Sequence, residues 1–210
     1  MPSPIGHALA GLTVSWLGGR HTISNGPRLA SPLVFACIAA AVLPDLDLVF
    51  SSFHRGLTHS IGFSVLIMIV AAGVTGWVTG RILWREAVVV GAAHASHLVL
   101  DWLGADRLAP LGLQALWPFS HDYYISNWDL FLSTQRRDPL SIRAFGINAR
   151  AALREMAVMG PIAAAAWMLR RRRRSRARSS GPDARRRPSG AAGDRGGTSD
   201  RPVPRATRSE

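Results

Sequence analysis

The stretch Ala93–Asp101, A-H-A-S-H-L-V-L-D, decides how the rest of the sequence is interpreted. His94, His97 and Asp101 are spaced i, i+3 and i+7, so in an α-helix they share one face. Imidazoles and carboxylates bind zinc, and ionisable residues inside a membrane-length helix indicate a functional site. A buried polar cluster that hydrogen-bonds between helices would show the same spacing, so the stretch alone is compatible with both interpretations.

The surrounding sequence contains several apolar segments of helical length. They cover residues 4–18, 31–43, 61–79, 86–103 and 156–169. Residues 61–79 form the clearest membrane span, because about 20 apolar residues cross a hydrocarbon core. Pro44 is expected to end the second helix. We therefore predict an all-α, polytopic membrane protein with about four to five apolar helices.

Charge divides the chain into two parts. Residues 170–210 carry 14 arginines and a net charge of +10, which leaves only +2 for residues 1–169. We predict a membrane-embedded helical domain over residues 1–169 and a disordered basic tail over residues 170–210. Arginines that directly follow an apolar segment favour a stop-transfer or lipid-headgroup role over nucleic-acid binding. Membrane lipids are the expected partner, and no specific nucleic acid is expected.

The direction of each predicted helix places the ionisable residues at one end of the bundle. Two carboxylates leave the second segment, two histidines precede the third, and a histidine–carboxylate pair ends the fourth, which runs the opposite way. These residues are Asp45, Asp47, His54, His59, His97 and Asp101. Because unrelated polar residues would scatter over both ends, this convergence predicts one site at one membrane face.

Arginines gather at the opposite end of the predicted bundle. They are Arg20, Arg28, Arg81, Arg85 and the cluster over residues 170–178. The positive-inside rule places that end in the cytoplasm. We therefore predict a multi-pass protein of the inner membrane with a cytoplasmic tail and an outward-facing site, although Arg55 and Arg107 at the site end favour the reverse orientation.

The carboxylates and histidines each allow two roles. Asp45 and Asp47 either cap a helix that starts after Pro44 or bind metal, and one carboxylate can bridge two ions about 3.5–4 Å apart. His97 and Asp101 either both bind metal, or Asp101 orients His97 from outside the ligand shell.

The loop over residues 54–60 allows similar alternatives. His54 and His59 either bind metal or belong to an interfacial loop. Arg55 either holds an anionic substrate such as a phosphate in a bidentate contact or contacts a lipid headgroup. His94 lies deeper in its segment than His97, where a structural hydrogen bond is as plausible as ligation.

Five motifs resemble one family in the same order along the chain. They are P-S-P-I-G-H-A-L-A-G (2–11), L-P-D-L-D (43–47), H-R-G-L-T-H-S (54–60), H-L-V-L-D (97–101) and L-W-P-F-S (116–120). The chain resembles the YdjM-like group of predicted membrane-bound metal-dependent hydrolases. The resemblance implies a divalent metal site in a multi-helix membrane protein and adds His7 to its residues. The His/Asp constellation is also similar to that of zinc-dependent phospholipase C.

The combined interpretation is a membrane-bound hydrolase that cleaves an ester or phosphodiester in a small-molecule or lipid-linked substrate. No G-x-S-x-G elbow or phosphate-binding glycine loop is present, so metal-activated water is the expected nucleophile. Asp45, His59 and Arg55 are the catalytic candidates. The expected metal ligands are His7, Asp45, Asp47, His54, His59, His97 and Asp101, with zinc as the first choice and manganese as the second. The alternative is a non-catalytic metal-binding, structural or transport protein.

Overall fold

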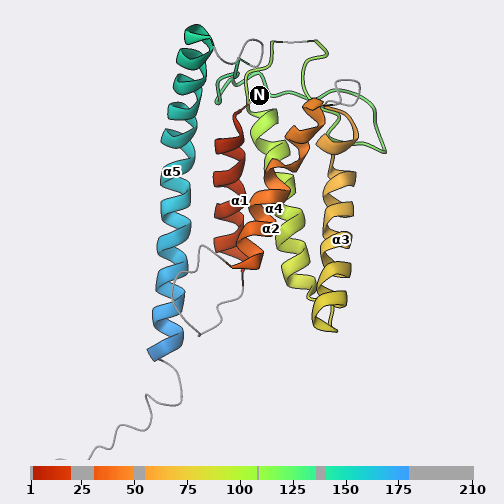
Figure 1. Cartoon of the computed structure of the whole chain (residues 1–210), viewed down its shortest axis with the longest axis vertical. Coiled ribbons are helices and arrows are strands. Elements are labelled where there is room, and N and C mark those ends of the chain that lie inside the picture. The colour runs from red at the N-terminus through yellow and green to blue at the C-terminus, as the bar shows by residue number, and fades with distance from the viewer. Residues whose placement is uncertain (1, 20–30, 50–54, 108, 136–140, 180–210) are drawn as a thin grey trace, which may run out of the picture.

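The computed structural model describes residues 2–19, 31–49, 55–107, 109–135 and 141–179. This part of the chain is all-α, as predicted, with five α-helices, two short 3₁₀ helices and no strand. Figure 1 shows α1 to α4 as a bundle, with the long α5 running along one side of it. His54 and residues 180–210 lie outside the described residues.

The first two helices begin with the same signal. α1 (Pro4–Gly18) and α2 (Pro32–Val42) each follow a serine N-cap and carry proline at the first helical position. The serine oxygen satisfies a free backbone N–H, and proline has no N–H to leave unsatisfied. After α2 the chain tightens into the 3₁₀ helix η1 (Leu43–Val49), which confirms that the α-helix ends just before Pro44, since proline cannot donate the next helical hydrogen bond.

The next two helices form an antiparallel pair. A second 3₁₀ turn, η2 (Leu57–His59), leads into α3 (Ile61–Thr79), and α4 (Trp84–Trp102) returns. Ser60 caps α3 by accepting a hydrogen bond from the Phe63 N–H, and Gly80 ends it at φ +68°. Glycine adopts this left-handed conformation without steric cost.

The described residues of the connector between α4 and α5, 103–107, 109–135 and 141, cover the end of the bundle where the N-terminus lies (Figure 1). The N–H of Ile61 donates to the Ala115 carbonyl at 2.8 Å, and the N–H of Gly62 donates to the Trp117 carbonyl at 3.3 Å. Ala115 and Trp117, just before and within the L-W-P-F-S motif, therefore satisfy free N–H groups in the first turn of α3.

α5 (Ile142–Ser179) is longer than the sequence predicted at both ends. It begins at Ile142, before the expected start at residue 156, and it continues ten residues past residue 169 through the arginine run. Arginine is a good helix former, so the run does not end the helix. The division of the chain into a membrane domain and a tail stays a prediction.

Among the described residues, two helices are long and apolar enough to cross a membrane, Ile61–Thr79 and Ile142–Arg176. Many large apolar side chains of α3 are exposed, including Ile69, Trp77 and Val78. α1 has 15 residues and rises only about 22 Å, less than a hydrocarbon core of about 30 Å. The structure thus has the expected number of helices, two of which have the length and composition of a span.

Small residues allow α1 and α2 to approach each other closely. A Cβ atom on Gly11 would lie 2.5 Å from the Cys37 carbonyl oxygen and 2.8 Å from the Ala41 Cβ. Buried Cys37, Ala40 and Ala93 continue the contact toward α4. Such small-residue interfaces are typical of membrane helices, where close packing drives association.

This packing predicts the effect of a single added methyl group. Gly11→Ala should lower the free energy of unfolding by about 1–3 kcal/mol, because the backbones of α1 and α2 must separate. Gly73→Ala on α3 is the matched control, since a Cβ there meets nothing within 4 Å, and it should be neutral or stabilise by up to about 1 kcal/mol. Thermal unfolding in detergent measures both, and equal effects would contradict the close α1–α2 contact.

Candidate metal centre

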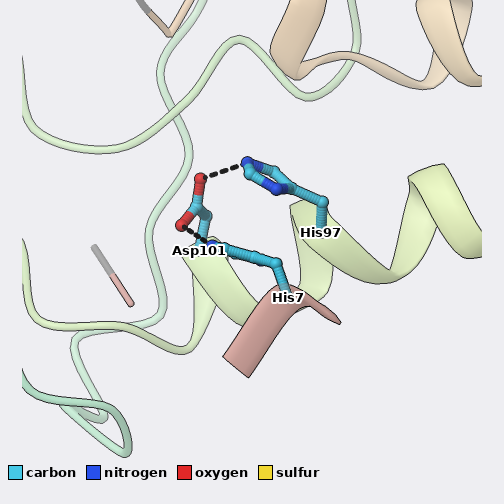
Figure 2. Close-up of side chains that lie close together, drawn as sticks. All are labelled: His7, His97 and Asp101. Carbon is cyan, nitrogen blue, oxygen red and sulfur yellow. Dashed lines mark ion pairs between the residues drawn. The ribbon is translucent and has the colours of Figure 1, made fainter. Parts of the chain in front are cut away.

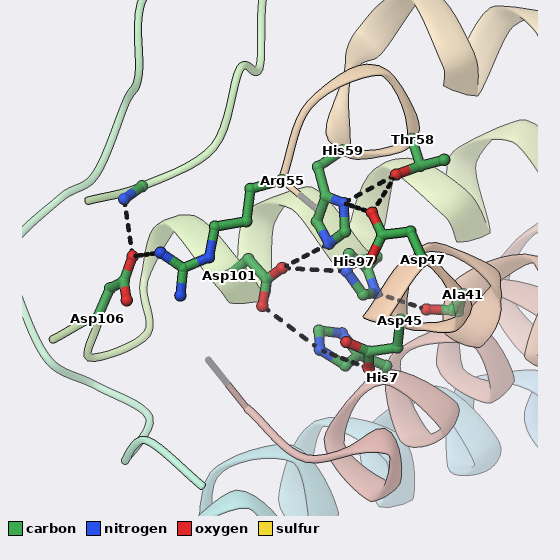
Figure 3. A network of polar contacts seen from close by, with 11 residues as sticks. His7, Ala41, Asp45, Asp47, Arg55, Thr58, His59, His97, Asp101 and Asp106 are labelled. Atoms are coloured by element: carbon green, nitrogen blue, oxygen red, sulfur yellow. Dashed lines mark hydrogen bonds and ion pairs between the residues drawn. The ribbon is translucent and has the colours of Figure 1, made fainter. Parts of the chain in front are cut away.

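The predicted site residues converge at the end of the bundle, as Figure 3 shows. α1, η1, η2 and α4 supply them, although these elements lie far apart in the sequence. They are His7, Asp45, Asp47, His59, His97 and Asp101, all buried. The directions of the helices, read from the sequence, predict this end for five of these side chains, and the family resemblance adds His7.

Three imidazoles face the carboxylate of Asp101. Its Oδ2 atom lies 3.0 Å from Nε2 of His97 and 3.5 Å from Nε2 of His59. Its Oδ1 atom lies 3.5 Å from Nε2 of His7, as Figure 2 shows from close by. Oδ2 of Asp45 lies 3.9 Å from the same His7 nitrogen. One acid on α4 is therefore the shared neighbour of histidines from three elements.

The two 3.5 Å distances, from His7 and His59 to Asp101, fit ligands of a shared metal ion better than direct hydrogen bonds, whereas the 3.0 Å distance from His97 fits a hydrogen bond. Ligand atoms at 2.0–2.1 Å around tetrahedral zinc lie about 3.3–3.4 Å apart. Hydrogen bonds from a ring nitrogen to oxygen are shorter, at about 2.7–3.2 Å. Two overlapping groups, His7–His97–Asp101 and Asp45–His59–His97, each place one ligand atom per residue within 4.8 Å of the others. The donor set therefore fits a divalent ion.

Buried polar atoms at the same place support this fit. Both nitrogens of His7, Nε2 of His97 and both carboxylate oxygens of Asp101 are buried and have no hydrogen-bond partner among the described residues. Buried polar groups are almost always satisfied in proteins, and an ion is one of the few explanations for a group of exceptions.

Two of the imidazoles are oriented by contacts to Nδ1, the ring nitrogen that faces away from Asp101. Nδ1 of His97 lies 2.8 Å from the Ala41 carbonyl oxygen. A carbonyl only accepts hydrogen bonds, so Nδ1 carries the proton and Nε2 presents its lone pair to the centre. Metal-binding histidines are commonly held by such a backbone carbonyl.

His59 is held in the same manner by a carboxylate. Its Nδ1 lies 3.2 Å from Oδ2 of Asp47, which also accepts a 2.6 Å hydrogen bond from the Thr58 hydroxyl. Nε2, on the other side of the ring, faces Asp101. Asp47 therefore lies on the outer side of His59, although the sequence suggested that it binds metal directly.

Ring stacking fixes the histidines relative to each other. The rings of His7 and His97 stack with centroids 3.8 Å apart and 22° between their planes. His59 meets His97 edge-on, with centroids 4.9 Å apart. These contacts join α1, α4 and η2 around Asp101.

Arg55 is bound to the connector. Its Nη1 atom donates to Oδ2 of Asp106 at 2.6 Å and to the Pro110 carbonyl at 2.8 Å. The same Asp106 oxygen accepts a hydrogen bond from the Gly112 N–H. Arg55 has a φ of +69°, a conformation that costs energy in residues other than glycine and is concentrated at functional sites.

His94 makes a structural hydrogen bond, which the sequence offered as an alternative to metal ligation. Its Nδ1 lies 2.8 Å from the Ser64 hydroxyl on α3, and its ring packs against Phe63 with centroids 5.4 Å apart. The contact links α3 and α4 one turn before His97.

The sequence interpretation missed two acidic residues, Asp106 and Glu155. Asp106 holds Arg55, and Glu155, fully buried on α5, accepts hydrogen bonds from the first turn of α1. Asp106 belongs to no periodic pattern. The sequence signal for Glu155 is its position close to an apolar run. An acid in a membrane helix is costly unless it has a partner.

The comparison with known proteins agrees with the geometry. The family model described as YdjM inner membrane protein matches residues 1–175. No curated protein matches the chain, and no solved structure does. The match covers every residue of the centre and confirms the family suggested by the five motifs.

The centre predicts the metal content of the purified protein. We expect the detergent-purified chain to carry a divalent metal and Asp101→Asn to weaken its binding more than about 10-fold, since outer-shell changes alone cost 10–100-fold. His121→Ala is the control, because His121 is exposed on the connector. Elemental analysis and metal titration measure both. A folded parent protein without metal would contradict the assignment.

Proposed function

The chain belongs to the YdjM inner membrane protein family, and from this premise we propose that it is a membrane-bound metal-dependent hydrolase. Its substrate would be an ester or phosphodiester, either a small molecule or one linked to a lipid. The observation that supports this proposal is the convergence of three Nε2 atoms, from His7, His59 and His97, on Asp101.

The proposed ligands are these three histidines and Asp101, with Asp45 beside them. Imidazole and carboxylate suit zinc, and manganese is the second choice. When bound, the ion would polarise a carbonyl or phosphoryl oxygen and lower the pKa of a water molecule to about 7.

The other residues would position substrate and protons. Asp45, whose Oδ2 lies 3.9 Å from His7 Nε2, is near enough to the ligands to accept a proton as general base. Asp47 would keep His59 in the tautomer that presents Nε2. Arg55, fixed by Asp106, would hold an anionic substrate group. Ligation by His54 stays a prediction.

A non-catalytic metal protein is the second candidate, and a specific observation favours it. The side chains of His7, His59 and His97 are fully buried, and structural metal sites are closed, whereas catalytic ones keep an open position. Transport or structural roles belong to the same class. Measured turnover separates this class from the hydrolase.

The length of α5 supports the proposed orientation. Fifteen residues separate Glu155, beside the start of α1, from Arg170, a rise of about 22 Å. The arginine run therefore lies at the other end of the bundle from the centre, and by the positive-inside rule it would be cytoplasmic. The centre would then lie in the outer leaflet, where lipid-linked substrates are available.

The hydrolase proposal is tested by separating metal binding from turnover. We expect the metal-loaded protein to hydrolyse members of a panel of phosphodiesters and carboxylic esters, in water-soluble and lipid-linked forms. Asp45→Asn should lower kcat by about 10²–10⁴-fold while metal remains bound, because general bases contribute this much. His121→Ala should leave turnover unchanged. An inactive parent protein with full metal content would favour the non-catalytic class.

The orientation is tested by cysteine labelling. Cys37 is buried and can be replaced by serine. In that background, Asp122→Cys on the connector should react with a membrane-impermeant maleimide in intact cells. Ser175→Cys in the arginine run should react only after the membrane is opened. The reverse pattern would place the centre on the cytoplasmic side.

A further inference from the structure

Glu155 is a fully buried acid on α5 that faces the first turn of α1. Its carboxylate accepts hydrogen bonds from the Ser3 N–H at 2.6 Å, from the Gly6 N–H at 2.9 Å and from the Ser3 hydroxyl. An acid buried among apolar helices is costly unless it is paired. Three donors from one neighbouring helix provide this pairing.

These donors belong to the start of a helix. The first N–H groups of an α-helix have no partner within the helix, and the N-terminal end carries a partial positive charge. Ser3 already caps α1 with its own side chain. Glu155 adds a second cap from another helix, so its charge and its geometry both match the site that it occupies.

The approach of Glu155 requires the absence of a side chain at residue 6. A Cβ atom on Gly6 would lie 2.8 Å from Oε2 and 3.1 Å from Cδ of Glu155. Any other residue would push the carboxylate away from the Gly6 N–H. Glycine at this position is therefore matched to the acid on α5.

The capped turn leads directly into the metal centre. His7 follows Gly6, and its ring stacks on His97 and faces Asp101. The apolar contacts of α1 with its neighbours, such as Ala10 with Leu100 and Met159, are non-directional and permit small shifts along the helix axis. The hydrogen bonds to Glu155 are directional and fix the height and rotation of this turn.

We propose that Glu155 is a positioning residue for the metal centre, which holds the first turn of α1 so that His7 Nε2 faces Asp101 and Asp45. This inference rests on the proposed metal-binding function. The described residues of α5 supply no ligand, and the proposal gives this helix a role in fixing the geometry of the ligands.

The first test measures metal binding with Glu155→Gln in the full-length chain. The amide keeps the size of the side chain but replaces one acceptor oxygen by a donor, so at least one hydrogen bond to α1 is lost. Co²⁺ affinity should fall about 10-fold, as for other outer contacts of metal ligands, and the visible Co²⁺ spectrum should change. Ser3→Ala, which keeps the acid, should produce a smaller change in the same direction.

The matched control is Met159→Ala, one helical turn further along α5. Met159 is buried among Ala10, Leu100 and Phe131 without polar contacts. Its truncation should lower the melting temperature but leave Co²⁺ affinity within about twofold and the spectrum unchanged. If Met159→Ala and Glu155→Gln weaken Co²⁺ binding equally at matched stability, Glu155 only stabilises the fold and the proposal is wrong.

A second test needs no metal. His7 is fully buried, so its carbethoxylation by diethyl pyrocarbonate, followed by mass spectrometry, should be slow in the parent protein and in Met159→Ala. It should be severalfold faster in Glu155→Gln. Parent-like affinity, spectrum and labelling in Glu155→Gln would overturn the positioning role while leaving the metal centre intact. A parent protein that binds no Co²⁺ would instead refute the proposed function itself.

Discussion

The structure depends on one buried carboxylate shared by three imidazoles. Asp101 is fully enclosed, and Asp45 and Asp47 are buried close by. Arg55 forms an ion pair with Asp106 on the connector. Buried charges are tolerated when they are paired or coordinate a metal. A divalent cation bound among His7, His59 and His97 would supply positive charge beside Asp101 and would explain why the nitrogens face the acid.

The convergence depends in turn on how the helices begin and end. Pro44 stops α2 as an α-helix, and the 3₁₀ turn that follows carries Asp45 and Asp47 at the end of the bundle. Gly11 lets the backbone of α1 contact α2, which keeps His7 within stacking distance of His97. A proline and a glycine thus place the side chains of the centre without taking part in it.

Local patterns made much of this predictable from sequence. Serine–proline pairs start two helices, Pro44 ends one, and the alternating directions of the helices place Asp45, Asp47, His59, His97 and Asp101 at one end, while His7 follows from the family resemblance. The outer role of Asp47, the pairing of Arg55 with Asp106 and the contact of Glu155 with α1 depend on segments distant in sequence, and no local pattern predicts them. The apolar pattern underestimates the C-terminal extent of α5 because it stops at the arginine run, whereas arginine continues the helix.

The two proposed functions differ in what they require of the connector. A structural metal site needs no path for substrate, and the full burial of His7, His59 and His97 is consistent with such a closed site. Hydrolysis requires a path from the membrane interface to the ligands. Asp106 and Pro110 belong to the connector, and both bind Arg55 from the loop that leads to His59. Because this polar contact joins the covering segment to the loop that leads to His59, substrate access in a hydrolase would be coupled to the position of Arg55.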